Sequence, residues 1–330
     1  MENRYSRQIT YMGKYAQDRI SKSKVCVVGC GALGSSSADL LVRAGVGTVK
    51  LVDRDFVELS NLQRQRVFSE SDIDKPKATA LAKKLKKINS SVNIDFLVED
   101  LNSRTAENIL KGCDLVIDGF DNMHSRFVLN EACVKLGIPW IYGSAIRNAG
   151  YASFIDTGEN CLRCFIKNAP SEIETCETAG VTNAITSLIS AIQVNETLHY
   201  LSDKIPSLSG RLFYADLEKM SVKTFAVKKN PECQVCSLKE FGLLNNRLSS
   251  FASLCGGNSY HISPPSKIKL DLQGAKMRLP KTFKITSSNK FLVRAVSGSK
   301  EITLFGDGRM ITKNLEKSDA EKTFKRMVLV

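Results

Sequence analysis

A glycine-rich loop, with an acidic residue some distance after it, is the first place where residue spacing could support chemistry. Gly29, Gly31 and Gly34 have the spacing G-x-G-x-x-G between an apolar run and a helical pattern. Such a loop lets backbone N–H groups approach a phosphate at the positive end of a helix dipole. Asp53 follows 19 residues after Gly34, where its carboxylate can accept hydrogen bonds from a ribose. Alone, this pattern indicates a nucleotide and is most typical of an NAD-dependent dehydrogenase.

The polar loop after Asp53 is richer in charge than a dehydrogenase requires. A hydride-transfer enzyme has only a pyrophosphate diester to neutralise, whereas an enzyme that cleaves ATP must hold a triphosphate and compensate charge that builds up during transfer. A carboxylate for magnesium could come from Asp118 or Asp121, at the end of another buried strand. Each charged residue taken alone is more often part of a surface ion pair, but their grouping at strand ends favours an ATP site. The group after Asp53 comprises Asp55, Asn61, Gln63, Arg64, Gln65 and Lys77.

Two Cys-x-x-Cys pairs suggest a metal site. Cys161 and Cys164 are separated by 68 residues from Cys233 and Cys236. Four thiolates are the number that a tetrahedral structural zinc ion takes. A redox pair is the alternative, and the lack of a thioredoxin-like context disfavours it. Because no histidine lies near either pair, we expect a closed zinc site without a catalytic water.

The remaining cysteines give a weaker signal. Cys176 precedes a long predicted helix, a position that favours the nucleophilic thiolate, but Glu174 and Glu177 oppose it, so an inert and a reactive role both stay open. Free thiols agree with a reducing, cytoplasmic location. The other five cysteines are expected to be small buried side chains: Cys26, Cys30, Cys113, Cys133 and Cys255.

An α/β framework is needed to bring these residues together, and the apolar pattern predicts one. Strands are expected at residues 25–28, 49–53, 92–98, 114–118 and 139–142, and helices from Leu33 to Gly45 and from Pro76 to Ile88. The alternation predicts a doubly wound, Rossmann-like sheet with ligands at the carboxyl ends of its strands. Further strands are expected at 151–155, 211–214 and 223–227, with a long helix at about 182–201.

Composition indicates a folded chain with two domains. The chain has 330 residues, 43% hydrophobic and 25% charged, which excludes wholesale disorder. We expect a large domain at residues 1–254 that includes the cysteine pairs, and a small α+β domain at 255–330 of unknown role, with a hairpin turn at Gly306–Gly308. No stretch approaches the roughly 18 apolar residues of a membrane span, and the polar N-terminus is not a secretory signal.

The net charge is +13, from 47 basic and 34 acidic residues. Such a field favours an acidic partner, or serves only solubility. Nucleic acid is disfavoured because the lysines at 83–87 are typical of a solvated helix face and no aromatic residues are interleaved with them.

Taken together, the chain resembles the ubiquitin-activating-like adenylyltransferases of sulfur-carrier pathways, the family of the molybdopterin-synthase and thiazole-biosynthesis adenylyltransferases. The resemblance covers about residues 3 to 240, and its motifs occur in family order. These motifs are Arg4–Gln8, Gly29–Gly34, Leu59–Gln65, Lys75–Lys77, Asp121–Asn122, both cysteine pairs, and Cys176 with Ala179–Val181.

The resemblance implies that the protein binds ATP and Mg²⁺ and adenylates the C-terminal glycine of a small ubiquitin-like carrier ending in Gly-Gly, releasing pyrophosphate. It places Asp53 on the ribose, Asn61, Arg64 and Lys77 on the phosphates, and Asp121 on magnesium. Arg7 would reach the ATP of the other subunit in a homodimer. In some relatives the cysteine matching Cys176 forms a covalent link with the carrier, and in others it is dispensable.

Two departures from the family pattern stand out. Gly119-Phe120 replaces the usual Cys-Thr or Ala-Thr pair before Asp121, and the family's optional sulfurtransferase domain is absent, so any sulfur donor would be a separate protein. Two alternatives remain: an enzyme that adenylates a small-molecule or peptide carboxylate, and a non-catalytic nucleotide-binding or NAD-dependent protein.

Overall fold

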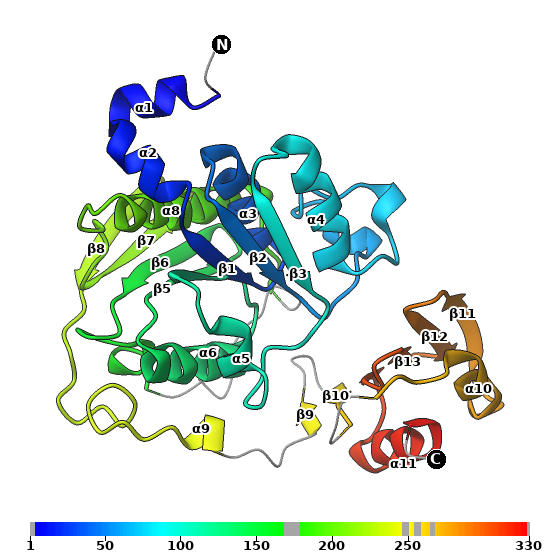
Figure 1. Ribbon diagram of the computed structural model, residues 1–330. Coiled ribbons are helices and arrows are strands. Elements are labelled where there is room, and N and C mark those ends of the chain that lie inside the picture. Colours follow the sequence, from blue (N-terminus) through cyan, green and yellow to red (C-terminus); the bar gives the residue numbers. More distant parts are fainter. Residues whose placement is uncertain (1–3, 168–178, 246–250, 254–258, 265–267, 329–330) are drawn as a thin grey trace. The chain divides into compact units, whose positions relative to one another are not determined.

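The computed structural model describes residues 4–167, 179–245, 251–253, 259–264 and 268–328 (Figure 1). The chain divides into two compact units, Met1–Arg247 and Leu248–Val330, which are described separately. The predicted functional division at residue 254 stays a prediction.

An eight-stranded sheet forms the centre of the first unit, with the strand order β3-β2-β1-β4-β5-β6-β7-β8. Neighbours from β3 to β5 are parallel, and the strands from β5 to β8 pair antiparallel. The predicted Rossmann-like half is therefore confirmed. The strands are β1 (Lys24–Val28), β2 (Thr48–Val52), β3 (Asn93–Leu97), β4 (Leu115–Asp118), β5 (Trp140–Ile146), β6 (Ala149–Ile155), β7 (Arg211–Asp216) and β8 (Ser221–Ala226).

Helices cover both faces of this sheet, with α3, α4 and α8 on one side and α5 and α6 on the other (Figure 1). Alternation along β1 serves both layers, because Val25 and Val27 face the first core and Cys26 and Val28 the second. The helices are α1 (Ser6–Met12), α2 (Lys14–Ile20), α3 (Ala32–Ala44), α4 (Lys77–Ile88), α5 (Ala106–Leu110), α6 (Met123–Leu136), α8 (Asn183–Leu201) and α9 (Gly242–Asn245), with short 3₁₀ turns at Leu59–Asn61, Glu70–Asp72 and Leu162–Cys164.

Local chemistry sets the ends of these helices. Gly45 adopts a left-handed conformation, with φ of 81°, and ends α3 at the predicted position. Pro76 precedes α4, also as predicted. Asn122 caps α6 by accepting a 2.9 Å hydrogen bond from the Ser125 amide. The sequence analysis did not predict α6, because the helix is buried on all sides over residues 125–134 and shows no apolar stripe.

The second unit is a small α+β unit with an antiparallel sheet in the order β11-β12-β13-β14-β10-β9. Strands β13 and β14 pair across the predicted turn at residues 306–308, and Ile302, Leu304, Phe324 and Met327 belong to its own core. Its elements are β9 (Phe251–Ser253), β10 (Tyr260–Ile262), α10 (Leu272–Met277), β11 (Lys284–Ser288), β12 (Leu292–Ser297), β13 (Lys300–Phe305), β14 (Met310–Lys313) and α11 (Lys317–Val328).

Candidate functional site

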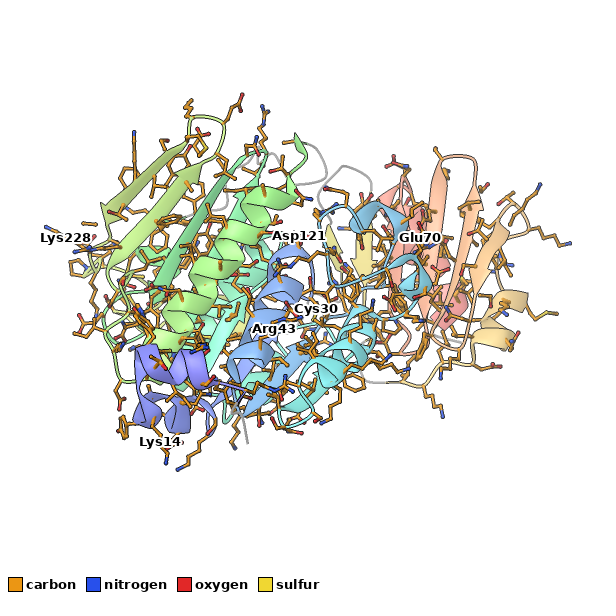
Figure 2. The ribbon with its side chains drawn as sticks, turned by 90° about the horizontal axis from the view of Figure 1, so that it is seen from above. Lys14, Cys30, Arg43, Glu70, Asp121 and Lys228 are labelled. Atoms are coloured by element: carbon orange, nitrogen blue, oxygen red, sulfur yellow. The ribbon has the colours of Figure 1, made fainter. Side chains whose placement is uncertain are left out.

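The candidate site lies where β1, β2 and β4 end at the same edge of the sheet. The glycine loop follows β1, Asp53 follows β2, and Asp121 follows β4. Their convergence is direct at one point, where the Cys30 amide donates a 2.5 Å hydrogen bond to Asp53 Oδ2. Figure 2 shows Cys30 and Asp121 in the middle of the first unit, whereas the exposed Lys14 and Lys228 lie at its periphery.

Backbone packs against backbone at Gly29, Gly34 and Gly119, which leaves no room for a side chain at these three positions. A Cβ on Gly34 would lie 1.8 Å from the carbonyl oxygen of Gly29, and one on Gly119 would lie 2.3 Å from the same oxygen. The helix α3 begins at Ala32, within this glycine motif, and no side chain caps its N-terminus. Its first-turn N–H groups are thus available to an anion.

Lys77 supplies a buried cation to this edge. Its ammonium lies 3.5 Å from Asp55 Oδ2. Burial lowers the pKa of Lys77, but the carboxylates of Asp55 and Asp53 outweigh it and raise the pKa, so the amine stays protonated at neutral pH. Burial raises the pKa of Asp53, and Lys77 opposes that shift. A positive charge beside the ribose position can neutralise a phosphate.

The 59–65 segment brings further polar groups to the loop. Asn61 is buried and accepts a hydrogen bond from the Glu58 amide at 3.2 Å, while Arg64 is half-buried and donates to the Ser60 carbonyl at 3.0 Å. Gln65 is buried against Gly31, and its Oε1 has no hydrogen-bond partner in the part of the chain that the structure describes. Because buried polar atoms are nearly always bonded, this acceptor fits a ligand that donates there.

The two carboxylates after β4 have different surroundings. Asp118 is fully buried, and its Oδ2 accepts a 2.8 Å hydrogen bond from Arg126 Nε. Arg126 also donates to the carbonyl oxygens of Phe120 and Gly143, so Asp118 holds the loop in place and does not face a ligand. Asp121 is exposed and accepts a 3.2 Å hydrogen bond from Asn122. The sequence analysis missed Arg126, whose only signal is a basic residue within an otherwise buried helix.

One predicted site residue is not brought to this edge, and another lies outside the described residues. Arg7 is exposed on α1, which lies at the opposite end of α3, since Gln8 donates to the Ala44 carbonyl at 2.9 Å. A 13-residue helix is about 20 Å long, so Arg7 lies far from the glycine loop of its own chain. Cys176 falls outside the described residues, as does Cys255. Cys26, Cys30, Cys113 and Cys133 are buried, as predicted.

The four paired cysteines form one cluster. Their sulfur atoms all lie within 4.8 Å of one another, with 3.6 Å between Cys161 and Cys233 and 3.4 Å between Cys164 and Cys236. In a tetrahedron with metal–sulfur bonds of about 2.3 Å, the sulfurs are about 3.8 Å apart. The cluster could therefore hold a metal ion, and it would tie the segment after β6 to the segment after β8.

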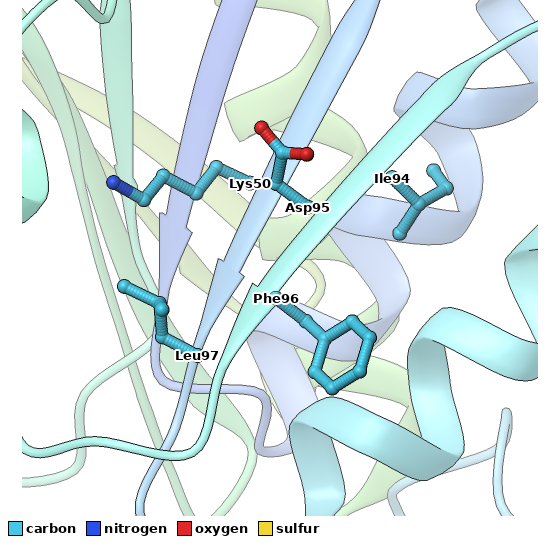
Figure 3. Close-up of a pocket in the computed structure, with 5 residues that line it drawn as sticks. All are labelled: Lys50, Ile94, Asp95, Phe96 and Leu97. Carbon is cyan, nitrogen blue, oxygen red and sulfur yellow. The ribbon is translucent and has the colours of Figure 1, made fainter.

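A shallow pocket beside the edge strand β3 is separate from these residues. It is lined by Lys50, Ile94, Asp95, Phe96 and Leu97 (Figure 3), none of which is a predicted site residue. Among the described residues, the structure contains no helix with the length and apolar character of a membrane span.

Comparisons with known proteins identify the family and the fold of the chain. A sulfur carrier protein ThiS adenylyltransferase from Bacillus subtilis is 33% identical over 317 residues, covering 94% of each chain. A SAMP-activating enzyme E1 from Haloferax volcanii is 34% identical over 71% of this chain and 88% of that relative. The fold also matches the crystal structure of E. coli MccB with ATP, with a TM-score of 0.64 and 22% identity over 72% of this chain and 75% of that chain. The ThiF family model matches residues 5–235, and the chain therefore belongs to the ThiF family.

Proposed function

We propose that the protein adenylates the C-terminal glycine of a small ubiquitin-like sulfur carrier ending in Gly-Gly, using ATP and Mg²⁺ and releasing pyrophosphate. One observation carries this proposal: the glycine loop, Asp53 and Asp121 follow neighbouring strand ends in a chain of the ThiF family, and Lys77 lies 3.5 Å from Asp55 beside them. The substrate class is supported by the Bacillus subtilis relative, which bears the name of a ThiS adenylyltransferase and matches 94% of the chain.

The chemistry requires positioning more than activation. A carboxylate is already a nucleophile, so its oxygen attacks the α-phosphorus while the bond to the bridging oxygen breaks and pyrophosphate leaves with the electron pair. Lys77 and Arg64 compensate the charge on the phosphates, and Asp53 holds the ribose. The other proposed ATP contacts are Gly29, Gly31, Gly34, Asp55, Asn61 and Gln65.

A divalent cation suits the charge balance at this edge. The carboxylates of Asp55, Asp53, Asp121 and Glu58 all act on Lys77, so these acidic groups outnumber the two nearby cations, Lys77 and Arg54. An anionic triphosphate entering such a site needs further positive charge. Asp121 would hold Mg²⁺, which would neutralise phosphate charge when bound, because its carboxylate is exposed whereas that of Asp118 is paired with Arg126.

The four-cysteine cluster is proposed to hold a structural Zn²⁺. Four thiol ligands close the coordination shell, so no position is left for a catalytic water. The metal would stabilise the two segments that carry Cys161 and Cys233.

We further propose a cytoplasmic homodimer in which Arg7 reaches the partner's ATP. Tyr11 and Tyr15, on the same helical arm as Arg7, have exposed fractions of 79% and 67%, and a second copy would cover them. A separate protein is proposed to supply any sulfur.

Carrier-dependent exchange of labelled pyrophosphate into ATP tests the proposal. Purified protein, ATP, Mg²⁺ and a cognate carrier ending in Gly-Gly should give exchange that vanishes without the carrier. Lys77→Ala and Asp121→Asn should each lower the rate about 100-fold. Lys87→Ala is the matched control, because Lys87 is exposed at the far end of the same helix. No exchange with cognate carriers would contradict the proposal, and AMP formation from a small acid alone would favour the alternative substrate.

A further inference from the structure

A chain of four alternating charges follows the sheet edge beside the proposed ATP site. Asp100 Oδ1 lies 3.0 Å from Arg54 Nη1, Arg54 Nε lies 3.7 Å from Asp55 Oδ1, and Asp55 Oδ2 lies 3.5 Å from Lys77 Nζ. The two oxygens of Asp55 therefore face two different cations. This series of ion pairs thus connects Asp100, through Arg54 and Asp55, to the Lys77 amine, which is proposed to contact the phosphates.

Three separate elements meet in this chain. Arg54 and Asp55 follow β2, Asp100 follows the neighbouring strand β3, and Lys77 begins α4 (Figure 1). Asp100 is held on its own side, because its carbonyl accepts a 2.6 Å hydrogen bond from Thr105 and its Oδ2 accepts one from Asn102 at 3.3 Å. Asp100 is consequently the fixed end of this series of four charged residues.

Partial burial strengthens the ion pairs of this series. The side chains of Arg54 and Asp100 are 19% and 15% exposed, so water screens their attraction only in part. Burial lowers the pKa of Arg54, but Asp100 and then Asp55 outweigh it and raise the pKa. Asp100, the nearer of the two carboxylates, raises the pKa of Arg54 more than Asp55 does, so Arg54 is held more strongly by Asp100.

We propose that Arg54 and Asp100 are positioning residues for Lys77. Asp100 anchors Arg54, Arg54 fixes one oxygen of Asp55, and the other oxygen of Asp55 holds the Lys77 amine in place for a phosphate. Without Arg54, both Asp55 oxygens turn to Lys77 and draw its amine away from the ligand. Without the charge of Asp100, Arg54 shifts onto Asp55 and competes with Lys77. This inference rests on the proposed function only in taking ATP as the ligand of Lys77.

The test is the ATP dependence of Arg54→Gln and Asp100→Asn. Each variant should raise the KM for ATP in the exchange assay about tenfold while the KM for the carrier stays the same. The double variant should be no worse than the poorer single variant, because the pair acts as a unit. Arg54→Lys should be intermediate, since one ammonium cannot reach both carboxylates as the guanidinium fork does.

A matched control and a binding measurement separate positioning from structure. Arg43→Gln removes an arginine from the Arg43–Asp39 ion pair of α3, with a 3.0 Å separation, and should leave the KM for ATP unchanged. Calorimetric ATP binding without carrier should weaken about tenfold in Arg54→Gln. A purely structural role would instead lower the thermal unfolding midpoint and leave the ATP affinity of the folded protein as in the wild type.

The failures of the two proposals are distinguishable. If Arg54→Gln and Asp100→Asn both bind ATP as tightly as the wild-type protein does, the positioning role is overturned. The proposed function still stands in that case, provided that the wild-type protein shows carrier-dependent exchange. Wild-type protein that binds ATP but gives no carrier-dependent exchange overturns the adenylation of the carrier, while the binding comparison still decides the role of Arg54. Wild-type protein that binds no ATP overturns both.

Discussion

Removing the proposed zinc ion from the four-cysteine cluster should destabilise the first unit by an amount that follows from the length of the loop that the cluster closes. The cluster connects Cys164 to Cys233, and 233 − 164 gives a closed loop of 69 residues. Releasing such a loop in the unfolded chain increases its conformational entropy, which corresponds to about 4 kcal/mol of lost stability. For a unit of this size, that loss lowers the unfolding midpoint by about 10 °C.

The assay is thermal unfolding of protein purified without added metal, before and after a strong chelator. Elemental analysis should give about one zinc ion per chain, and adding zinc back should restore the midpoint. Cys233→Ser serves as the control, because the chelator should produce no additional shift once the cluster is broken. An unchanged midpoint after complete removal of zinc would refute the role of the cluster as a staple.

Three further perturbations address separate parts of the fold. Gly34→Ala should abolish ATP binding measured by calorimetry, because its Cβ would lie 1.8 Å from the Gly29 carbonyl oxygen. A variant that binds ATP as tightly as the wild-type protein would contradict the role of the glycine loop in holding the phosphates. Arg126→Met should lower the free energy of unfolding in urea by about 3–5 kcal/mol, since it leaves Asp118 charged and buried, and a loss below about 1 kcal/mol would argue against a charged Asp118. Asp72→Asn should cost about 1 kcal/mol at pH 7. Burial raises the pKa of Asp72, but hydrogen bonds from Lys84 and Ser69 outweigh it and lower the pKa. The charged Asp72 therefore stabilises the fold at pH values above the pKa of Asp72 in the unfolded chain, and this stabilisation disappears as the pH falls. The difference in stability between the two proteins should shrink as the pH falls from about 4 through the lowered pKa of folded Asp72, and a difference that does not change over this range would contradict the assignment.

Much of the first unit was predictable because its signals are local. The apolar run of β1, the glycine that ends α3 and the proline before α4 each act within a few residues. Helix α6 escaped prediction because neighbouring elements bury it on every side, so its sequence has no polar face. Such a helix is defined by its surroundings rather than by its own pattern.

The candidate site was predictable in its motifs but not in its internal pairing. Asp118 and Asp121 have the same residue type and nearly the same position, so their pattern alone could not tell which one faces a ligand, and only the family resemblance assigned magnesium to Asp121. The structure distinguishes them, because Arg126, in the first turn of α6, reaches back to Asp118 at the end of β4. Arg54 and Asp100 are 46 residues apart and meet only because β2 and β3 end together. Contacts between distant segments of this kind leave no periodic signal.

A crystal structure of the protein with a non-hydrolysable ATP analogue and Mg²⁺ tests the central claim most directly. The account predicts the phosphates over the glycine loop, Lys77 and Arg64 in contact with phosphate oxygens, the ribose on Asp53, and the metal beside Asp121. A nucleotide bound elsewhere, or bound at this loop with Arg64, Lys77 and Asp121 all turned away from it, would contradict the account.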